Sequence, residues 1–137
     1  MFTLANYVGV SAGSKDWNDV CKANAARLMA ACAKLQGMMV KDGVVFHLNP
    51  ATGTTISGQI YGGFRPRDCP TGAPRSAHKT GEAVDRYDPK GELDAWITAH
   101  PEALVECGVY IEAPESTIGW SHWSIRVTSS GRHIFHP

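Results

Sequence analysis

Apolar residues recur at helical spacing near the start of the chain, over residues 16–36 and on to Met39. Their steps alternate between four and three, as on the core-facing side of an amphipathic helix. The stripe consists of Cys21, Ala25, Leu28, Cys32, Leu35 and Met39. Ser14 or Asp16 can cap the start of this helix, and Gly37 is placed to end it. The pattern predicts one long helix packed on a core.

Shorter apolar runs further along the chain predict strands and two more helices. Residues 44–48 and 56–60 have the composition of strands, with a turn between them. Residues 92–99 indicate a short helix, and a proline opens a second helical segment over 101–107. Residues 109–113 alternate between apolar and polar positions, which is typical of a half-buried strand.

The last β-rich run, over residues 119–127, also alternates with period two. Its more apolar face contains Ser121, Trp123, Ile125 and Val127, whereas Trp120, His122, Ser124 and Arg126 share the polar face. His122 is therefore expected to face away from the core. Together the elements predict a single α+β domain over residues 1–137, with helices packed on a small, mainly antiparallel sheet.

Composition limits the classes of partner. The chain has 43% hydrophobic and 19% charged residues, as in an ordinary globular domain. Thirteen basic and thirteen acidic residues cancel, which argues against nucleic acid or an anionic membrane bound by bulk charge. No run is long enough for membrane insertion, and the N-terminus lacks the pattern of a signal peptide. We expect a monomer made in the cytoplasm.

The four cysteines do not form a recognisable disulfide framework. Cys21 and Cys32 lie on one predicted helix, separated by roughly 16 Å along its axis, which is too far for a bridge. Cys69 and Cys107 are scattered, and no C-x-x-C pair occurs. Reduced thiols are expected, and none is assigned to a metal.

Three residues have the chemistry of zinc ligands. His78 precedes a turn at Gly81, and Asp85 follows that turn on a predicted strand, where its carboxylate can face a pocket while Val84 packs inward. His122 supplies a third ligand from the last strand. Each histidine alone is more often structural, but two imidazoles and one carboxylate leave a fourth zinc position for water.

The string Ser76-x-His78-x-x-Gly81-x-Ala83-x-Asp85, followed by Trp120-x-His122, resembles the zinc D-Ala-D-Ala carboxypeptidase family of peptidoglycan peptidases. That family includes D,D-dipeptidases and phage endolysins. The resemblance runs from Ile56 to the end of the chain. It implies the fold shared by these peptidases and hedgehog domains, Zn²⁺ held by His78, Asp85 and His122, and a peptidoglycan peptide as substrate.

The same resemblance suggests residues that bind the substrate. Gly62-Gly63-Phe64-Arg65-Pro66 looks like the segment that supplies the family's substrate-binding arginine, which here is Arg65. Its guanidinium can hold a carboxylate or a developing oxyanion. This segment lies in a long Gly- and Pro-rich loop over residues 61–74, where Arg65 and Arg67 would otherwise be solvated surface residues. Ser76 and Trp120, within the matching strings, are further candidates.

One departure from the family concerns the catalytic base. Many members have a glutamate three residues before the second histidine ligand, where this chain has Gly119. Glu112, on the polar face of its strand, is the preferred substitute, and Glu115 is the alternative catalytic base. Glu112 can instead be a structural acceptor for a backbone amide or for Arg126.

Two functions therefore follow from the sequence. The first is a zinc metallopeptidase that acts on the cell wall, as a phage lysis protein or a virion-associated enzyme, and cleaves an amide bond in the peptide part of peptidoglycan. D-Ala-D-Ala, L-Ala-D-Glu and cross-bridge bonds remain open, since specificity depends on the shape of the pocket. The second is a non-catalytic, zinc-stabilised module that binds cell wall or builds a virion, which the absence of a side chain at Gly119 allows.

Overall fold

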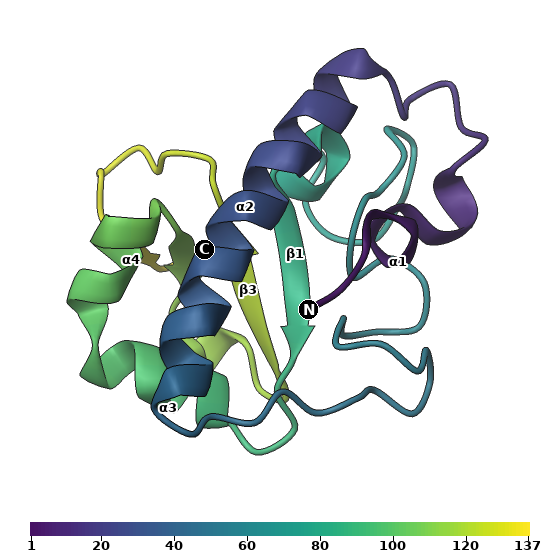
Figure 1. The fold of residues 1–137 in the computed structure, drawn as a ribbon. Helices are drawn as coiled ribbons and strands as arrows, with labels where there is room; N and C mark the ends of the chain where they lie inside the picture. Colours follow the sequence, from purple (N-terminus) through teal and green to yellow (C-terminus); the bar gives the residue numbers. More distant parts are fainter.

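Four α-helices and a four-stranded sheet build the protein, seen in a computed structural model that describes all 137 residues (Figure 1). The α-helices are α1 (Leu4–Val8), α2 (Asp19–Lys41), α3 (Glu92–Ala99) and α4 (Pro101–Cys107). The strands are β1 (Ala83–Tyr87), β2 (Tyr110–Glu112), β3 (Trp120–Ser124) and β4 (Ile134–Phe135). Short 3-10 helices are η1 (Gly9–Ser11), η2 (Ala77–Thr80) and η3 (Pro114–Ser116). The predicted α+β class is confirmed.

The strands lie in the order β1-β3-β2-β4. β3 pairs antiparallel with β1 and with β2, whereas β2 pairs in parallel with β4. The sheet is therefore mixed, and its parallel edge was not predicted. Within the register, Val84 lies opposite Trp123 and Asp85 lies opposite His122. These two pairs point to opposite faces, because successive residues of a strand alternate.

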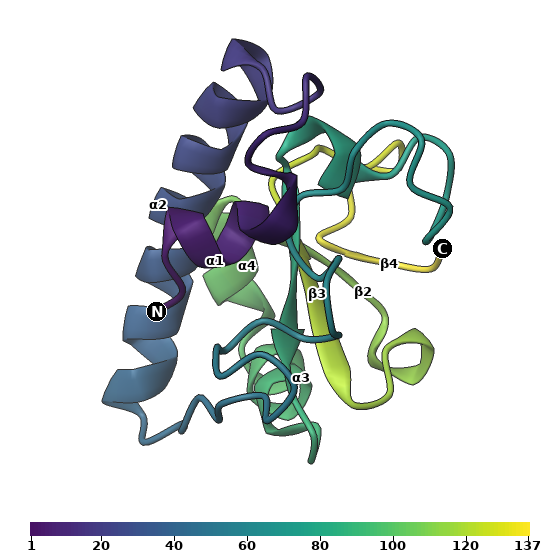
Figure 2. The ribbon, with the colours of Figure 1, turned by 90° about the vertical axis from the view of Figure 1, so that its right-hand side faces the viewer.

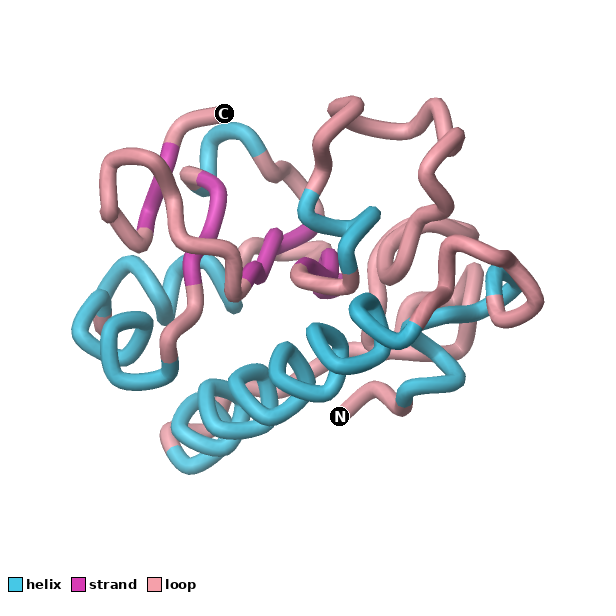
Figure 3. The backbone as a smooth tube through the Cα atoms, turned by 90° about the horizontal axis from the view of Figure 1, so that it is seen from above, coloured by secondary structure: helices cyan, strands magenta, loops and turns pink.

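Helix α2 covers one face of the sheet, and most loops lie on the other side (Figures 2 and 3). The six residues of its predicted stripe are all buried, in one core cluster with Val84, Ile111 and Trp123. The core is therefore a layer between α2 and the inner face of the sheet. The opposite face of the sheet is left available for polar side chains.

The ends of α2 differ from the prediction. The helix is capped by Asn18, whose side chain accepts a hydrogen bond from the Cys21 amide, and not by Ser14 or Asp16. It also continues through the exposed Gly37. A glycine inside a helix costs about 1 kcal/mol, whereas burying a methionine contributes about 1.5–3 kcal/mol. The burial of Met39 therefore outweighs the cost at Gly37.

The strands predicted over residues 44–48 and 56–60 do not form. Residues 44–48 pair with no other strand, and Val45 and Leu48 are exposed. The second segment contributes one isolated bridge, between Ile56 and Arg86 on the outer edge of β1. Apolar composition predicted strands here, but a strand forms only when its backbone pairs with a neighbouring strand. The segment that follows residue 54 pairs with the free edge of β1 over only a few residues, which is too short for a regular strand.

Other predictions agree with the structure. The helices expected over 92–99 and 101–107 are α3 and α4, and residues 110–112 of the run 109–113 form β2. The four cysteines are buried free thiols. None of the helices, α2 included, combines the length and the apolarity needed to cross a membrane.

Candidate metal centre

Three side chains far apart in the sequence meet on the outer face of the sheet. His78 lies in η2, Asp85 in β1 and His122 in β3, and all three are buried. Their ligand atoms lie within 4.8 Å of one another. Oδ1 of Asp85 is 3.1 Å from Nε2 of His78 and 2.9 Å from Nδ1 of His122.

The chemistry of this group suits a metal ion. Ligand atoms that share one tetrahedral zinc at bond lengths of about 2.0–2.2 Å lie about 3.4 Å apart. The two separations at Asp85 are close to that spacing. In the absence of an ion, Nδ1 of His122 can donate a hydrogen bond to the carboxylate. The buried group of His78, Asp85 and His122 can therefore hold a metal ion.

The orientation of His78 is set by the loop before η2. Its Nδ1 atom lies 2.7 Å from the carbonyl oxygen of Gly63. A carbonyl oxygen only accepts hydrogen bonds, so Nδ1 carries the proton and donates it. In the neutral imidazole the lone pair then lies on Nε2, the atom that faces Asp85. A metal-binding histidine typically has such a partner for its second nitrogen.

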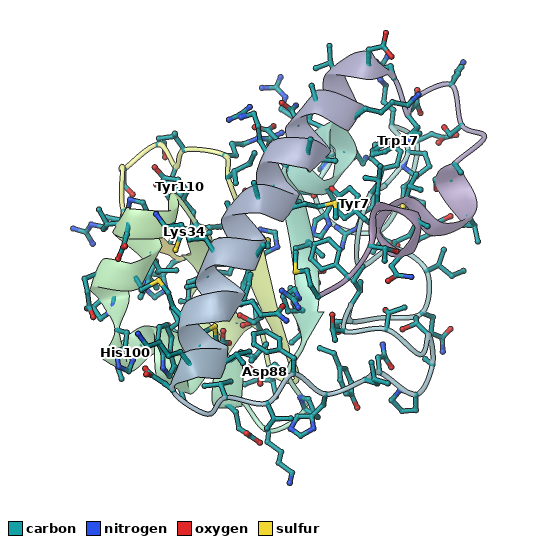
Figure 4. All side chains as sticks on the ribbon, in the orientation of Figure 1. Tyr7, Trp17, Lys34, Asp88, His100 and Tyr110 are labelled. Carbon is teal, nitrogen blue, oxygen red and sulfur yellow. The ribbon has the colours of Figure 1, made fainter.

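The segment that carries Gly63 is itself braced by Tyr7 of helix α1. The carbonyl oxygen of Tyr7 accepts a hydrogen bond from the Phe64 amide at 2.9 Å. Its hydroxyl donates to the carbonyl oxygen of Ala83 in β1, also at 2.9 Å, which places Tyr7 between α1 and β1 (Figure 4). A Cβ atom at Gly63 would lie 2.1 Å from the Tyr7 carbonyl oxygen. Only glycine fits at this close approach.

Arg65 contacts one of the three candidate ligands, Asp85, directly. Its Nη2 atom donates to Oδ2 of Asp85 at 3.2 Å, and its Nε atom donates to the Tyr61 carbonyl oxygen at 2.8 Å. Burial alone would raise the pKa of Asp85, but the charges and hydrogen bonds of His78 and His122 outweigh it. The pKa of this carboxyl therefore lies well below its usual value, and Asp85 is ionised at neutral pH.

One residue from each strand lies in a single row across the outer face of the sheet. Asp85 on β1 is opposite His122 on β3, and Glu112 on β2 is opposite Phe135 on β4. The register that pairs Ile111 with Trp123, continued by one residue, places Glu112 across from His122. Side chains at such positions lie about 4.5–5.5 Å apart at Cβ. Glu112, the preferred candidate for the catalytic base, is therefore a neighbour of His122.

The two candidate bases occupy different surroundings. Glu112 forms no hydrogen bond or ion pair, and it lines the same hollow as the metal-type ligands. Arg126, suggested as its structural partner, pairs with Glu82 instead. The Glu115 side chain is 66% exposed and lies 3.3 Å from Nδ1 of His136. Glu115 does not line this hollow, although its partner His136 does.

The ligands open into a hollow of about 1080 Å³. The predicted substrate-binding residues Arg65, Ser76 and Trp120 all line it. Ser76 caps η2 by accepting a hydrogen bond from the His78 amide. The Trp120 ring is edge-on to the His122 ring, with centroids 6.5 Å apart. The structure thus gathers these residues around the ligand group.

A polar network that the sequence did not predict fixes the turn carrying His78. Arg126, just beyond β3, donates to Glu82, to the hydroxyl of Thr80 and to the carbonyl oxygen of Arg75. It thereby ties both sides of η2 to the strand of His122. Nothing in the local sequence pairs Glu82 with Arg126, since they lie 44 residues apart. The Gly62-Gly63 dipeptide was a visible signal for the close approach at Gly63.

Comparisons with models of protein families, with curated proteins and with solved structures find no match to this chain. Function is therefore inferred from the residues and geometry of this centre.

Proposed function

We propose that the protein is a zinc-dependent peptidase that hydrolyses an amide bond in the peptide part of bacterial peptidoglycan. The observation that carries the proposal is the row of Asp85, His122 and Glu112 beside His78, at the wall of an open hollow. Two histidines and one carboxylate form a ligand set typical of catalytic zinc. The resemblance to zinc D-Ala-D-Ala peptidases supplies the substrate class, and the cell wall is the proposed place of action.

Glu112 has the surroundings of a general base. A zinc ion held in this centre would act as a Lewis acid and would lower the pKa of a water molecule to about 7. Glu112 takes a proton from the attacking water and passes it to the nitrogen of the leaving amine. Its carboxylate is free for this role, because no protein group binds it. A short strand within the sheet also holds it more rigidly than a loop would.

Arg65 has a positioning role and a binding role in this proposal. Two of its nitrogens hold Asp85 and the Tyr61 carbonyl, while Nη1 makes no hydrogen bond with the protein. Nη1 therefore remains for a substrate carboxylate or for the oxyanion that develops at the attacked carbonyl. Trp120 offers an aromatic wall beside His122.

A non-catalytic metal-stabilised module is the second candidate. Two features favour it: residue 119 carries no side chain, and Asp85 accepts hydrogen bonds from His122 and Arg65 without an ion. Such a module would bind metal and cell wall but release no product. Turnover separates the two candidates.

The test combines metal analysis with digestion of purified cell walls. The full chain, loaded with zinc, is expected to contain one ion per monomer and to release new amino groups from the wall peptides. His122→Ala is expected to lose both. A zinc-loaded protein that binds cell walls but releases no amino groups would favour the non-catalytic module. Stoichiometric, tight zinc in His122→Ala would contradict the assigned site.

A further inference from the structure

A second hollow, of about 610 Å³, lies between η2 and the N-terminal part of α2 (Figure 1). The two elements are joined there by Asn24, whose Nδ2 atom donates to the Thr80 carbonyl oxygen at 2.9 Å. Ala77 and His78 of η2 line the large hollow, whereas Lys79 and Thr80 line this one. None of the three candidate metal ligands and neither candidate base lines it. The second hollow is therefore separate from the metal centre.

Positive charge is concentrated around this hollow, although basic and acidic residues balance over the whole chain. Four basic and two acidic residues line it, whereas the chain has thirteen of each. One of the four, Arg126, is neutralised by Glu82 at 3.1 Å. We call this space the basic hollow, and its charged residues are Arg67, Arg75, Lys79, Arg126, Asp16 and Glu82.

The three other cations have no acidic partner. The side chains of Arg67 and Arg75 form no hydrogen bond or ion pair with the protein. Lys79 uses one of its three ammonium protons, which it donates to the neutral Arg67 carbonyl oxygen at 2.9 Å. The Asp16 carboxylate accepts from the Arg67 backbone amide and pairs with none of the three cations. The basic hollow therefore presents uncommitted guanidinium and ammonium donors to an anion.

These donors suit phosphate better than carboxylate. A carboxylate is planar, and one guanidinium fork can occupy both of its oxygens. The oxygens of a phosphate point to the corners of a tetrahedron, so that several cations can approach it from different directions. Arg67 and Arg75 come from the loop before η2, and Lys79 comes from η2 itself. Three cations also exceed the charge of a single phosphodiester, which indicates a ligand with repeated phosphates.

The neutral lining excludes one common ligand of this charge. Proteins that bind single-stranded nucleic acid hold the bases on aromatic side chains, and no aromatic residue lines the basic hollow. The remaining side chains are small or polar, among them Asn18 and Ser76. Such a lining suits the hydroxyl groups of a polyol between the phosphates.

We propose that the basic hollow binds a polyol phosphate chain through Arg67, Arg75 and Lys79. The binding requires no chemical step and does not depend on the peptidase activity. The basic hollow shares Ser76 and Arg126 with the large hollow, so a chain bound there lies beside the metal centre.

The test is calorimetric titration of the zinc-loaded full chain at low ionic strength with three polymers that carry equal numbers of charges. They are poly(glycerol phosphate), poly-glutamate and oligothymidylate. Poly(glycerol phosphate) is expected to bind most tightly, and its affinity should fall as salt is added, because the hollow is open to solvent.

Two double variants locate the site. Arg67→Gln with Arg75→Gln should weaken the binding of poly(glycerol phosphate) about tenfold or more, because two charged donors are lost. Lys41→Gln with Lys90→Gln removes the same charge from exposed positions outside the basic hollow and should bind as the wild type does. Zinc content and Tm should be unchanged in both, since none of these four side chains holds a metal-type ligand.

Each contrary result overturns the proposal. Equal losses in the two double variants would show attraction by net charge instead of a site. Tighter binding of poly-glutamate would make the ligand a carboxylate, and tighter binding of oligothymidylate would make it a nucleic acid. An absence of binding to poly(glycerol phosphate) at low salt would refute the site and leave the proposed peptidase untouched.

Discussion

The imidazole of His78 donates its Nδ1 proton to the carbonyl oxygen of Gly63, 2.7 Å away, across fifteen residues of chain. Gly63 has no space for a side chain, because a Cβ atom there would lie 2.1 Å from the Tyr7 carbonyl oxygen. The orientation of a candidate ligand thus depends on a backbone contact with helix α1. The orientation of His78 can therefore be altered by a substitution at Gly63, without changing any of the three ligands.

Gly63→Ala is expected to weaken zinc binding. The new Cβ must push the loop away from Tyr7, and the carbonyl that orients His78 moves with it. Loss of such a supporting contact costs about 10- to 100-fold in metal affinity. Competition with a zinc chelator measures the affinity, and thermal unfolding should show a lower Tm. Gly13→Ala is the control, since its Cβ would meet no atom within 4 Å; equal zinc affinity in both variants would contradict the role of Gly63.

Arg65→Ala is expected to impair both metal binding and turnover. Removal of the guanidinium takes a charged partner from Asp85 and the free Nη1 from the hollow. We expect about tenfold weaker zinc binding and a larger loss of kcat/KM measured at saturating zinc. Arg67→Ala should have little effect, because the contacts of Arg67 with Asp16 and Lys79 use its backbone. Equal losses in the two variants would remove the reason for assigning Arg65 to the site.

Glu112→Gln separates catalysis from binding. The amide is nearly isosteric and Glu112 is not among the ligands, so fold and zinc content should be unchanged. Turnover of cell walls should fall by about 10²- to 10⁴-fold, the usual contribution of a general base. Glu115→Gln should be mild, since it alters one exposed contact with His136. An active Glu112→Gln enzyme beside an inactive Glu115→Gln enzyme would transfer the role to Glu115.

Arg86 offers a test of the core that is independent of the metal. Its guanidinium is fully buried, with Cζ 4.7–5.0 Å from the ring centroids of Phe2, Phe46 and Trp123. Burial lowers its pKa to about 10, and Nε and Nη1 have no hydrogen-bond partner.

Two substitutions at Arg86 should therefore differ in stability. Arg86→Ala leaves a cavity among the rings and should lower the free energy of unfolding by about 2–5 kcal/mol. Arg86→Met fills much of that space and removes a buried charge that has no acidic partner, so the loss should be about 1 kcal/mol or less. Urea unfolding of the two variants measures the difference. A larger loss in Arg86→Met than in Arg86→Ala would show that the charge itself stabilises the core.

Local periodicity was sufficient to predict the elements that bury one side against the core. The α2 stripe, helices α3 and α4, and the outward direction of His122 follow from spacing alone, because a helix or strand repeats its side-chain directions at a constant interval. The three metal-type ligands could also be selected from the sequence by their chemistry and by the turn at Gly81. Residues 44–48 show the limit of this reasoning. Their apolar composition predicted a strand, but no other strand lies beside them to pair with, so none forms.

Only the tertiary structure decided which distant groups meet. The contact of Gly63 with His78, the place of Glu112 beside His122, and the pairing of Glu82 with Arg126 depend on strand order and register. Arg86 enters the core because it shares a face of β1 with Val84, although its charge would suggest exposure. Such long-range contacts form only when the complete core has folded, so they cannot be predicted from a local sequence pattern.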